Sequence, residues 1–122
     1  MKIRTLNMLF AAAISVALLS NNAFALDCPT PQTGAEAGTL PQSAKDISET
    51  STRLAFGTTG NAVNEVIFDL RKKYPKANEE EIINYLITAY CPVVARKTGL
   101  SADQATDELK QFSAQVRSLV EN

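Results

Sequence analysis

The stretch that decides the fold is Asn78–Val94, NEEEIINYLITAYCPVV. Asn78 can accept a hydrogen bond from the backbone amide of Glu81, and the Glu81 side chain can reach back, which makes a capping box at a helix start. Apolar residues then cover more than one stripe of the helix, so we expect this helix to be the central one. Pro92 lacks the amide that would bond to the carbonyl of Thr88, and we expect it to kink the helix.

The segment before this stretch predicts another helix with one apolar face. That face is formed by Val63, Val66, Ile67, Leu70 and Tyr74. We expect Asn61 to cap the start of this helix. Pro75 is expected to end it, because a proline disfavours helical geometry in the residue before it.

The segment after the central stretch predicts the best-marked helix of the chain. Gly99 fits a helix stop, and Ser101 with Gln104 forms a second capping box. The apolar stripe of this helix is formed by Ala105, Leu109, Phe112, Val116, Leu119 and Val120.

A further helix is expected from about Ser43, on weaker grounds. Its stripe consists of Ala44, Ile47, Ser51, Leu54 and Ala55. The residues 50–52 are poor helix formers, so a strand over residues 52–56 is the competing prediction. The run 57–60, GTTG, is expected to break the element.

Residues 26–42 predict an extended arm without regular structure, because prolines and glycines are frequent there and large apolar residues are few. The two cysteines of the chain are Cys28 in this arm and Cys91 on the central helix. We expect them to form a disulfide that pins the arm across the helices, closing a loop that would stabilise the fold by roughly 4 kcal/mol. The predicted fold is all-α, a small up-down bundle of three or four helices over residues 43–122.

Residues 1–25 have the three parts of a secretory signal peptide. Lys2 and Arg4 make a positive start, an apolar run follows, and Ala23-Phe24-Ala25 matches the cleavage pattern. Cleavage after Ala25 would leave 97 of the 122 residues. An uncleaved anchor or a lipid on Cys28 are the alternatives. We expect a periplasmic or secreted protein with no stable membrane insertion after cleavage, in a compartment where disulfides persist.

The composition excludes several classes of function. The chain has no His and no Trp, and its formal net charge of −1 becomes −3 without Lys2 and Arg4. Nucleic-acid binding is therefore not expected. Because histidine is absent, the chain lacks the commonest general base, the commonest zinc ligand and the usual haem ligand. No nucleophile, phosphate-loop or dinucleotide motif occurs, so we expect no enzyme activity, no cofactor and no metal.

Two sets of residues form the candidate interaction surface. They are the basic cluster Arg71, Lys72, Lys73 and Lys76, and the tyrosines Tyr85 and Tyr90. Compensation of a helix dipole is the simpler explanation for the cluster, and core packing is the simpler explanation for the tyrosines.

The segments Asp69–Arg71, Glu80–Ile82 and Tyr85–Ile87, with Tyr90, resemble part of a helical hairpin of a known family. They are similar to the periplasmic helical domain of the apocytochrome-reducing subunit of cytochrome c maturation. The resemblance covers about 25 residues and implies a helical hairpin over residues 61–94. The L-R-C-x-x-C motif of that family is absent, so its thiol chemistry and its site residues are not transferred.

We expect a non-enzymatic protein that acts through protein–protein contact with an envelope protein, as an adaptor, an inhibitor or a subunit of an assembly. Two alternatives remain. One is a carrier that holds a small apolar ligand between its helices. The other is a chaperone that exposes apolar surface in acid.

Overall fold

The computed structural model describes residues 26–32, 40–57 and 60–122, and within these ranges the protein is all-helical. The four helices are α1 (Ala44–Phe56), α2 (Gly60–Lys73), α3 (Glu79–Ala95) and α4 (Ala102–Val120). The predicted all-α fold is confirmed, and the competing strand over residues 52–56 is wrong because α1 runs through it. The predicted signal peptide and residues 33–39 of the predicted arm lie outside the described residues.

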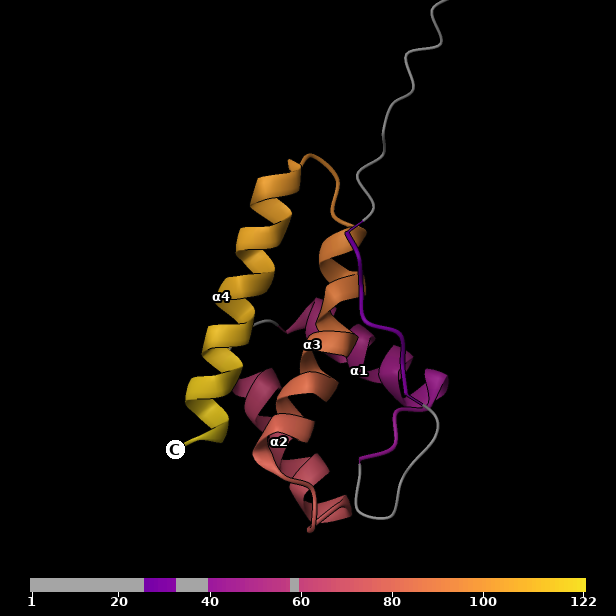
Figure 1. Ribbon diagram of the computed structural model, residues 1–122, viewed down its shortest axis with the longest axis vertical. Helices are drawn as coiled ribbons and strands as arrows, with labels where there is room; N and C mark the ends of the chain where they lie inside the picture. Colours follow the sequence, from indigo (N-terminus) through magenta and orange to yellow (C-terminus); the bar gives the residue numbers. More distant parts are fainter. Residues whose placement is uncertain (1–25, 33–39, 58–59) are drawn as a thin grey trace, which may run out of the picture.

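Helix α3 is the centre of the fold, as its breadth of apolar positions predicts. Ten of its residues are buried, more than in any of the other three helices. Helices α1 and α4 make the closest approach to α3, whereas α2 lies chiefly against α1 and α4 (Figure 1). The short link between α2 and α3 therefore does not make these two helices the main packing pair, unlike the hairpin that the resemblance implies.

Small residues allow α1 to approach α3 closely. Ser51 and Ala89 are both buried, and the Ser51 hydroxyl lies 2.6 Å from the carbonyl oxygen of Ala89 and 2.8 Å from that of Ile47. One turn away on α3, the hydroxyl of Tyr85 lies 3.3 Å from that of Thr50. Thr50 and Ser51, which weaken the helical pattern of α1, are thus the residues whose hydroxyls bond to α3.

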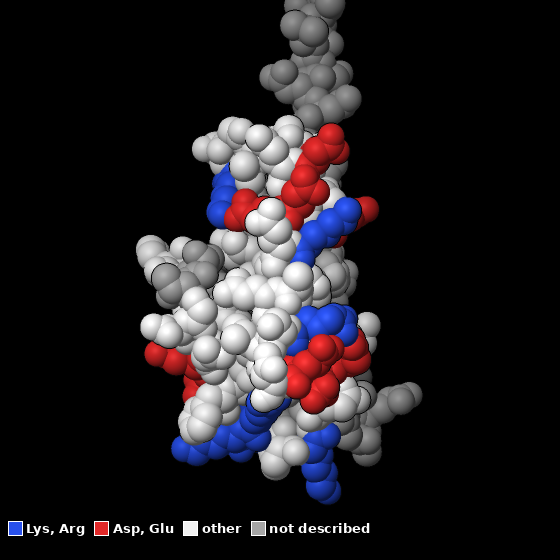
Figure 2. All heavy atoms as spheres, turned by 90° about the vertical axis from the view of Figure 1, so that its left-hand side faces the viewer, with Lys and Arg blue, Asp and Glu red and all other residues white. Residues whose placement is uncertain are grey.

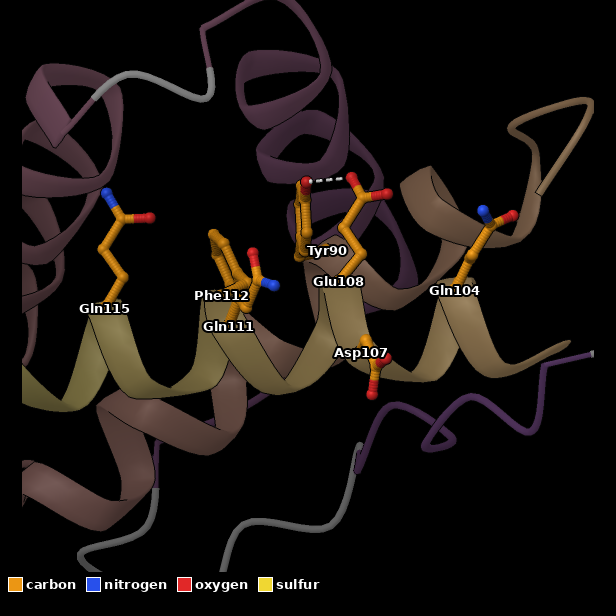
Figure 3. Close-up of a pocket in the computed structure, with 7 residues that line it drawn as sticks. All are labelled: Tyr90, Gln104, Asp107, Glu108, Gln111, Phe112 and Gln115. Atoms are coloured by element: carbon orange, nitrogen blue, oxygen red, sulfur yellow. Dashed lines mark hydrogen bonds between the residues drawn. The ribbon is translucent and has the colours of Figure 1, made fainter. Parts of the chain in front are cut away.

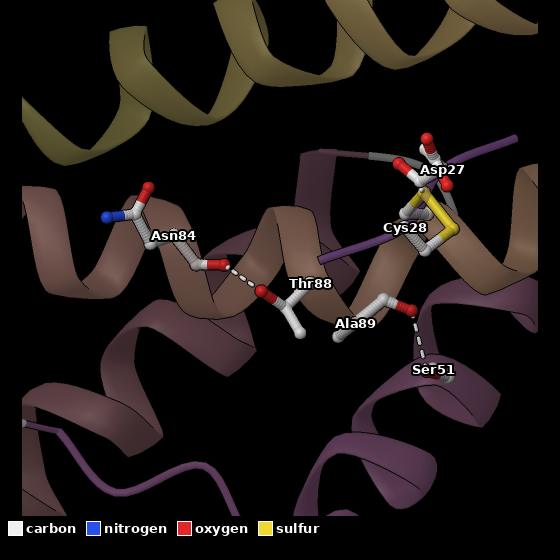
Figure 4. The surroundings of a disulfide bond; sticks show 7 residues. Asp27, Cys28, Ser51, Asn84, Thr88 and Ala89 are labelled. Carbon is white, nitrogen blue, oxygen red and sulfur yellow. Dashed lines mark hydrogen bonds between the residues drawn. A yellow bond between two sulfur atoms is a disulfide. The ribbon is translucent and has the colours of Figure 1, made fainter. Parts of the chain in front are cut away.

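The arm is held against the helices at more than one point. The predicted disulfide between Cys28 and Cys91 is present, with their Cα atoms 5.5 Å apart (Figure 4). Further along, the Gln42 amide donates to the carbonyl of Gln32 at 3.0 Å, and Leu40 is buried in the core. The described parts of the arm have no helix or strand, and residues 26–32 run beside α3 (Figure 1).

The ends of the helices test the predicted caps. Both capping boxes are present, Asn78 with Glu81 on α3 and Ser101 with Gln104 on α4. Asn61 is not a cap, because α2 already begins at Gly60. Helix α3 ends at Ala95, earlier than the predicted stop at Gly99, which instead adopts a left-handed conformation (φ 83°) in the link to α4.

The disulfide indicates an oxidising compartment outside the cytosol. Among the residues that the structure describes, the helices are too short or too polar to cross a bilayer.

Candidate interaction site

A surface hollow of about 560 Å³ runs along α4. Its floor is the ring pair Tyr90 and Phe112, stacked with their centroids 3.8 Å apart. Tyr90 comes from α3 and Phe112 from α4, so the hollow exists only because these two helices pack together (Figure 3). Its rim is formed by Gln104, Asp107, Glu108, Gln111 and Gln115.

The rim residues follow from the helical repeat. Gln104, Glu108, Gln111 and Gln115 recur at steps of four, three and four residues, which places them along one face of α4. Gln104 is engaged in the capping box of this helix. Gln111 is exposed, and Gln115 is half-buried beside the start of α2. Carboxamides both donate and accept hydrogen bonds, so this row can meet the polar groups of a polypeptide backbone.

Tyr90 and Glu108, which line the hollow, form a hydrogen-bonded trio with Lys97. The Tyr90 hydroxyl donates to the Glu108 carboxylate at 3.0 Å, and Lys97 donates to the same oxygen. The Lys97 ammonium holds the pKa of Glu108 below its ordinary value, although burial opposes this shift. Burial raises the pKa of Tyr90, and its bond to Glu108 raises it further. Glu108 is thus a charged, fixed acceptor at neutral pH, not a proton donor.

The residues of the predicted basic cluster make different contacts and do not act as one patch. The Arg71 guanidinium donates to the carbonyl oxygen of Val120 at 2.7 Å, so it joins α2 to the C-terminal end of α4. Lys73 lies over the ring of Tyr74, 5.4 Å from its centroid. Lys72 and Lys76 are exposed, and basic side chains are prominent at the lower end of the face in Figure 2.

The predicted tyrosines do not form an exposed aromatic surface. Tyr85 and Tyr90 are each only 4% exposed, because the wide apolar girth of α3 is covered by α1 on one side and α4 on the other. Tyr85 packs inside the core near Thr50, and only Tyr90 reaches the hollow on α4, as part of its floor. Both tyrosines are therefore core residues, as the simpler explanation predicts, and they offer little ring surface to a partner.

The hollow on α4 was not predicted as a site. Its signal in the sequence is the row of glutamines and Glu108 at helical spacing, which reads equally well as an ordinary solvated face. The missing information is that Tyr90 lies beneath this row, because which faces of α3 and α4 meet depends on tertiary packing.

The hollow is lined by polar side chains and by two nearly buried rings. No group of cysteines and carboxylates gathers in a metal-binding arrangement within the described ranges. The hollow offers amides and two carboxylates that can form hydrogen bonds with a partner, whereas the rings of its floor, Tyr90 and Phe112, are only 4% and 5% exposed.

Fold and site together define a small disulfide-bonded helical protein. The hollow along α4 is an open groove with a polar rim. Comparisons with protein-family models, with curated proteins and with solved structures give no match. The resemblance of residues 69–90 to the apocytochrome-reducing subunit therefore stays an expectation.

Proposed function

We propose that this protein acts without catalysis by binding a polypeptide segment of an envelope protein in the groove along α4. The observation that carries the proposal is the stacked floor of Tyr90 and Phe112 beneath a row of carboxamides. The role would be that of an adaptor, an inhibitor or a subunit of an envelope assembly.

The charge of the groove favours a basic segment. Its lining contains Asp107 and Glu108 and no Lys or Arg. Lys97 pairs with Glu108, which leaves the exposed Asp107 as the carboxylate that can meet a cation. Because the groove is open and its rim is polar, it suits a peptide better than the small apolar ligand of a carrier.

We further propose that residues 1–25 export the chain and are removed after Ala25. The disulfide supports this proposal, because such bonds persist in the periplasm and outside the cell. The mass of the protein recovered from the periplasm tests it. A mass that retains residues 1–25 would contradict the cleavage.

Photo-crosslinking in intact cells tests the groove. A photoreactive side chain at Gln111, which is exposed on the rim, is expected to capture one defined partner. The same side chain at Lys45, exposed on α1, is the matched control and should capture none. Equal capture from both positions, or none from Gln111, would contradict binding in the groove.

A charge reversal tests the chemistry of the occupant. Asp107→Lys should weaken capture from Gln111, because the substitution places a cation where a basic segment is proposed to lie. Asp103→Lys is the control, since Asp103 is exposed on the same helix and does not line the groove. Loss of capture with both variants would show a general charge effect and contradict a role specific to Asp107.

A further inference from the structure

The outward face of α2 carries an exposed aromatic ring that the fold does not use. Phe68 is 66% exposed. With about 100° per residue, it points away from the buried side of α2, which contains Val63, Val66 and Leu70. One exposed ring is common on a protein surface and would not by itself indicate a binding face.

A hollow beside the ring gives this face a shape. It has a volume of about 370 Å³ and lies between α1 and α2. Its lining residues are Arg53, Asn64, Glu65, Phe68 and Asp69. Arg53 forms an ion pair with Asp69 at 3.0 Å, which fixes one wall of the hollow. A second phenyl ring fits in this space against Phe68.

The face around Phe68 carries one acidic and one basic side chain, so two copies of this face can pair opposite charges. Glu65 lies one turn before Phe68 and Lys72 one turn after it, on the same side of the helix. The Glu65 side chain is 73% exposed, and its carboxylate lies 3.9 Å from the Arg53 guanidinium, which is long for an ion pair. Lys72 is exposed and has no ion pair within the described part of the chain.

We propose that the outward face of α2 binds a second copy of this chain. Two antiparallel α2 helices related by a two-fold axis at Phe68 bring Glu65 of each copy to Lys72 of the other. A two-fold interface forms each contact twice, so both ion pairs are made at once. The two phenyl rings meet at the centre and enter the hollows beside them. This surface is distinct from the groove on α4, and the proposal does not depend on the function proposed for that groove.

Sedimentation of the purified, oxidised protein over a range of concentrations tests the dimer. The unmodified chain should show a reversible monomer–dimer equilibrium. Phe68→Ser should raise the dissociation constant about tenfold or more, because it removes the central ring. Glu65→Lys and Lys72→Glu should each be monomeric at the same concentrations, because each places two pairs of like charges across the axis.

Mixing the two charge variants is the decisive step. One copy of Glu65→Lys and one copy of Lys72→Glu restore both opposite-charge pairs, so the mixture should form a heterodimer although neither variant dimerises alone. Lys110→Glu, exposed on α4, is the control and should dimerise like the unmodified chain. Circular dichroism checks that all variants keep their helices.

Three results would overturn the proposal. The first is a monomeric unmodified chain across the concentration range. The second is a dissociation constant that any of the three substitutions on α2 leaves unchanged, because the dimer would then use another face. The third is a mixture of folded charge variants that stays monomeric, because it would exclude the antiparallel register.

Discussion

At the scale of single residues, Ser51 joins two helices through one hydroxyl. Ser51→Ala removes the contact with the Ala89 carbonyl and should lower the free energy of unfolding by about 1 kcal/mol. Urea unfolding measures the difference. Thr52→Ala is the matched control, because the exposed Thr52 hydroxyl bonds only within α1, and both variants gain the same type of helix-favouring residue. Equal stability of the two variants would contradict a tertiary role for Ser51.

The two buried tyrosines predict how stability changes with alkali. Burial raises the pKa of Tyr85, against the lowering effect of the Thr50 hydroxyl, and burial also raises the pKa of Tyr90. A pKa that is higher in the folded state gives stability that is complete below the ordinary value of 10.0 and is lost as pH rises through the folded-state pKa values. Tyrosinate absorbance should therefore show these two groups ionising above their ordinary value, together with loss of helix.

Tyr85→Phe and Tyr90→Phe assign the signal, since each should remove one late-ionising group. Ionisation of both tyrosines at the ordinary pKa while the helices remain intact would contradict the prediction. The two residues differ in surroundings, because the bond from Tyr90 goes to a carboxylate and that from Tyr85 goes to a hydroxyl.

At the scale of helices, the capping boxes define where α3 and α4 begin. Asn78→Ala and Ser101→Ala should each lower the free energy of unfolding by about 1 kcal/mol, because each leaves a first-turn amide without its acceptor. Thermal unfolding measures both. Ser118→Ala, exposed in the last turn of α4, is the control and should change stability by less than about 0.5 kcal/mol. If Ser101→Ala behaves like Ser118→Ala, the cap of α4 is not a source of stability.

The sequence could predict those elements whose signals are local. The starts of α3 and α4 depend on side chains three residues apart, so both capping boxes were predicted correctly. Helix α1 was predicted weakly, because Thr50 and Ser51 are poor helix formers whose contacts are with α3, far along the chain. Asparagine is a good cap, so Asn61 predicts that α2 begins at residue 62, whereas the helix begins two residues earlier, at Gly60.

The arrangement of the helices, and with it the groove, could not be predicted in the same way. Link length brings α3 and α4 together, and Glu80 near the start of α3 does pair with Arg117 near the end of α4 at 2.7 Å. A link of similar length follows α2, yet α2 lies chiefly against α1 and α4. The floor of the groove joins Tyr90 to Phe112, a pairing set by packing across two helices and not by spacing within one.

At the scale of the whole molecule, the arm is part of the packed structure. Leu40 is 6% exposed and Leu26 packs against the same core, so residues at both ends of the arm contribute apolar surface. The Gln42 side chain accepts from the Gln32 amide at 3.2 Å, next to the backbone bond between the same residues. Burial of Leu26 and Leu40 thus holds the arm against the helices in addition to the disulfide.

Removal of the disulfide should separate the covalent contribution from these other contacts. The bond joins residues 63 apart in the chain, and closing a loop of this size in the unfolded state gives roughly 4 kcal/mol of stability in the chain-entropy model. Reduced protein, which keeps both cysteine side chains, should therefore unfold at a lower urea concentration than oxidised protein. Its free energy of unfolding should be lower by about this amount. A Cys28→Ala, Cys91→Ala double variant is the control, since its unfolding should not respond to the reductant. Because the disulfide ties Cys28 to α3, a protease of broad specificity should cut within residues 26–32 faster in reduced than in oxidised protein. Equal unfolding midpoints for oxidised and reduced protein would mean that these non-covalent contacts alone define the position of the arm.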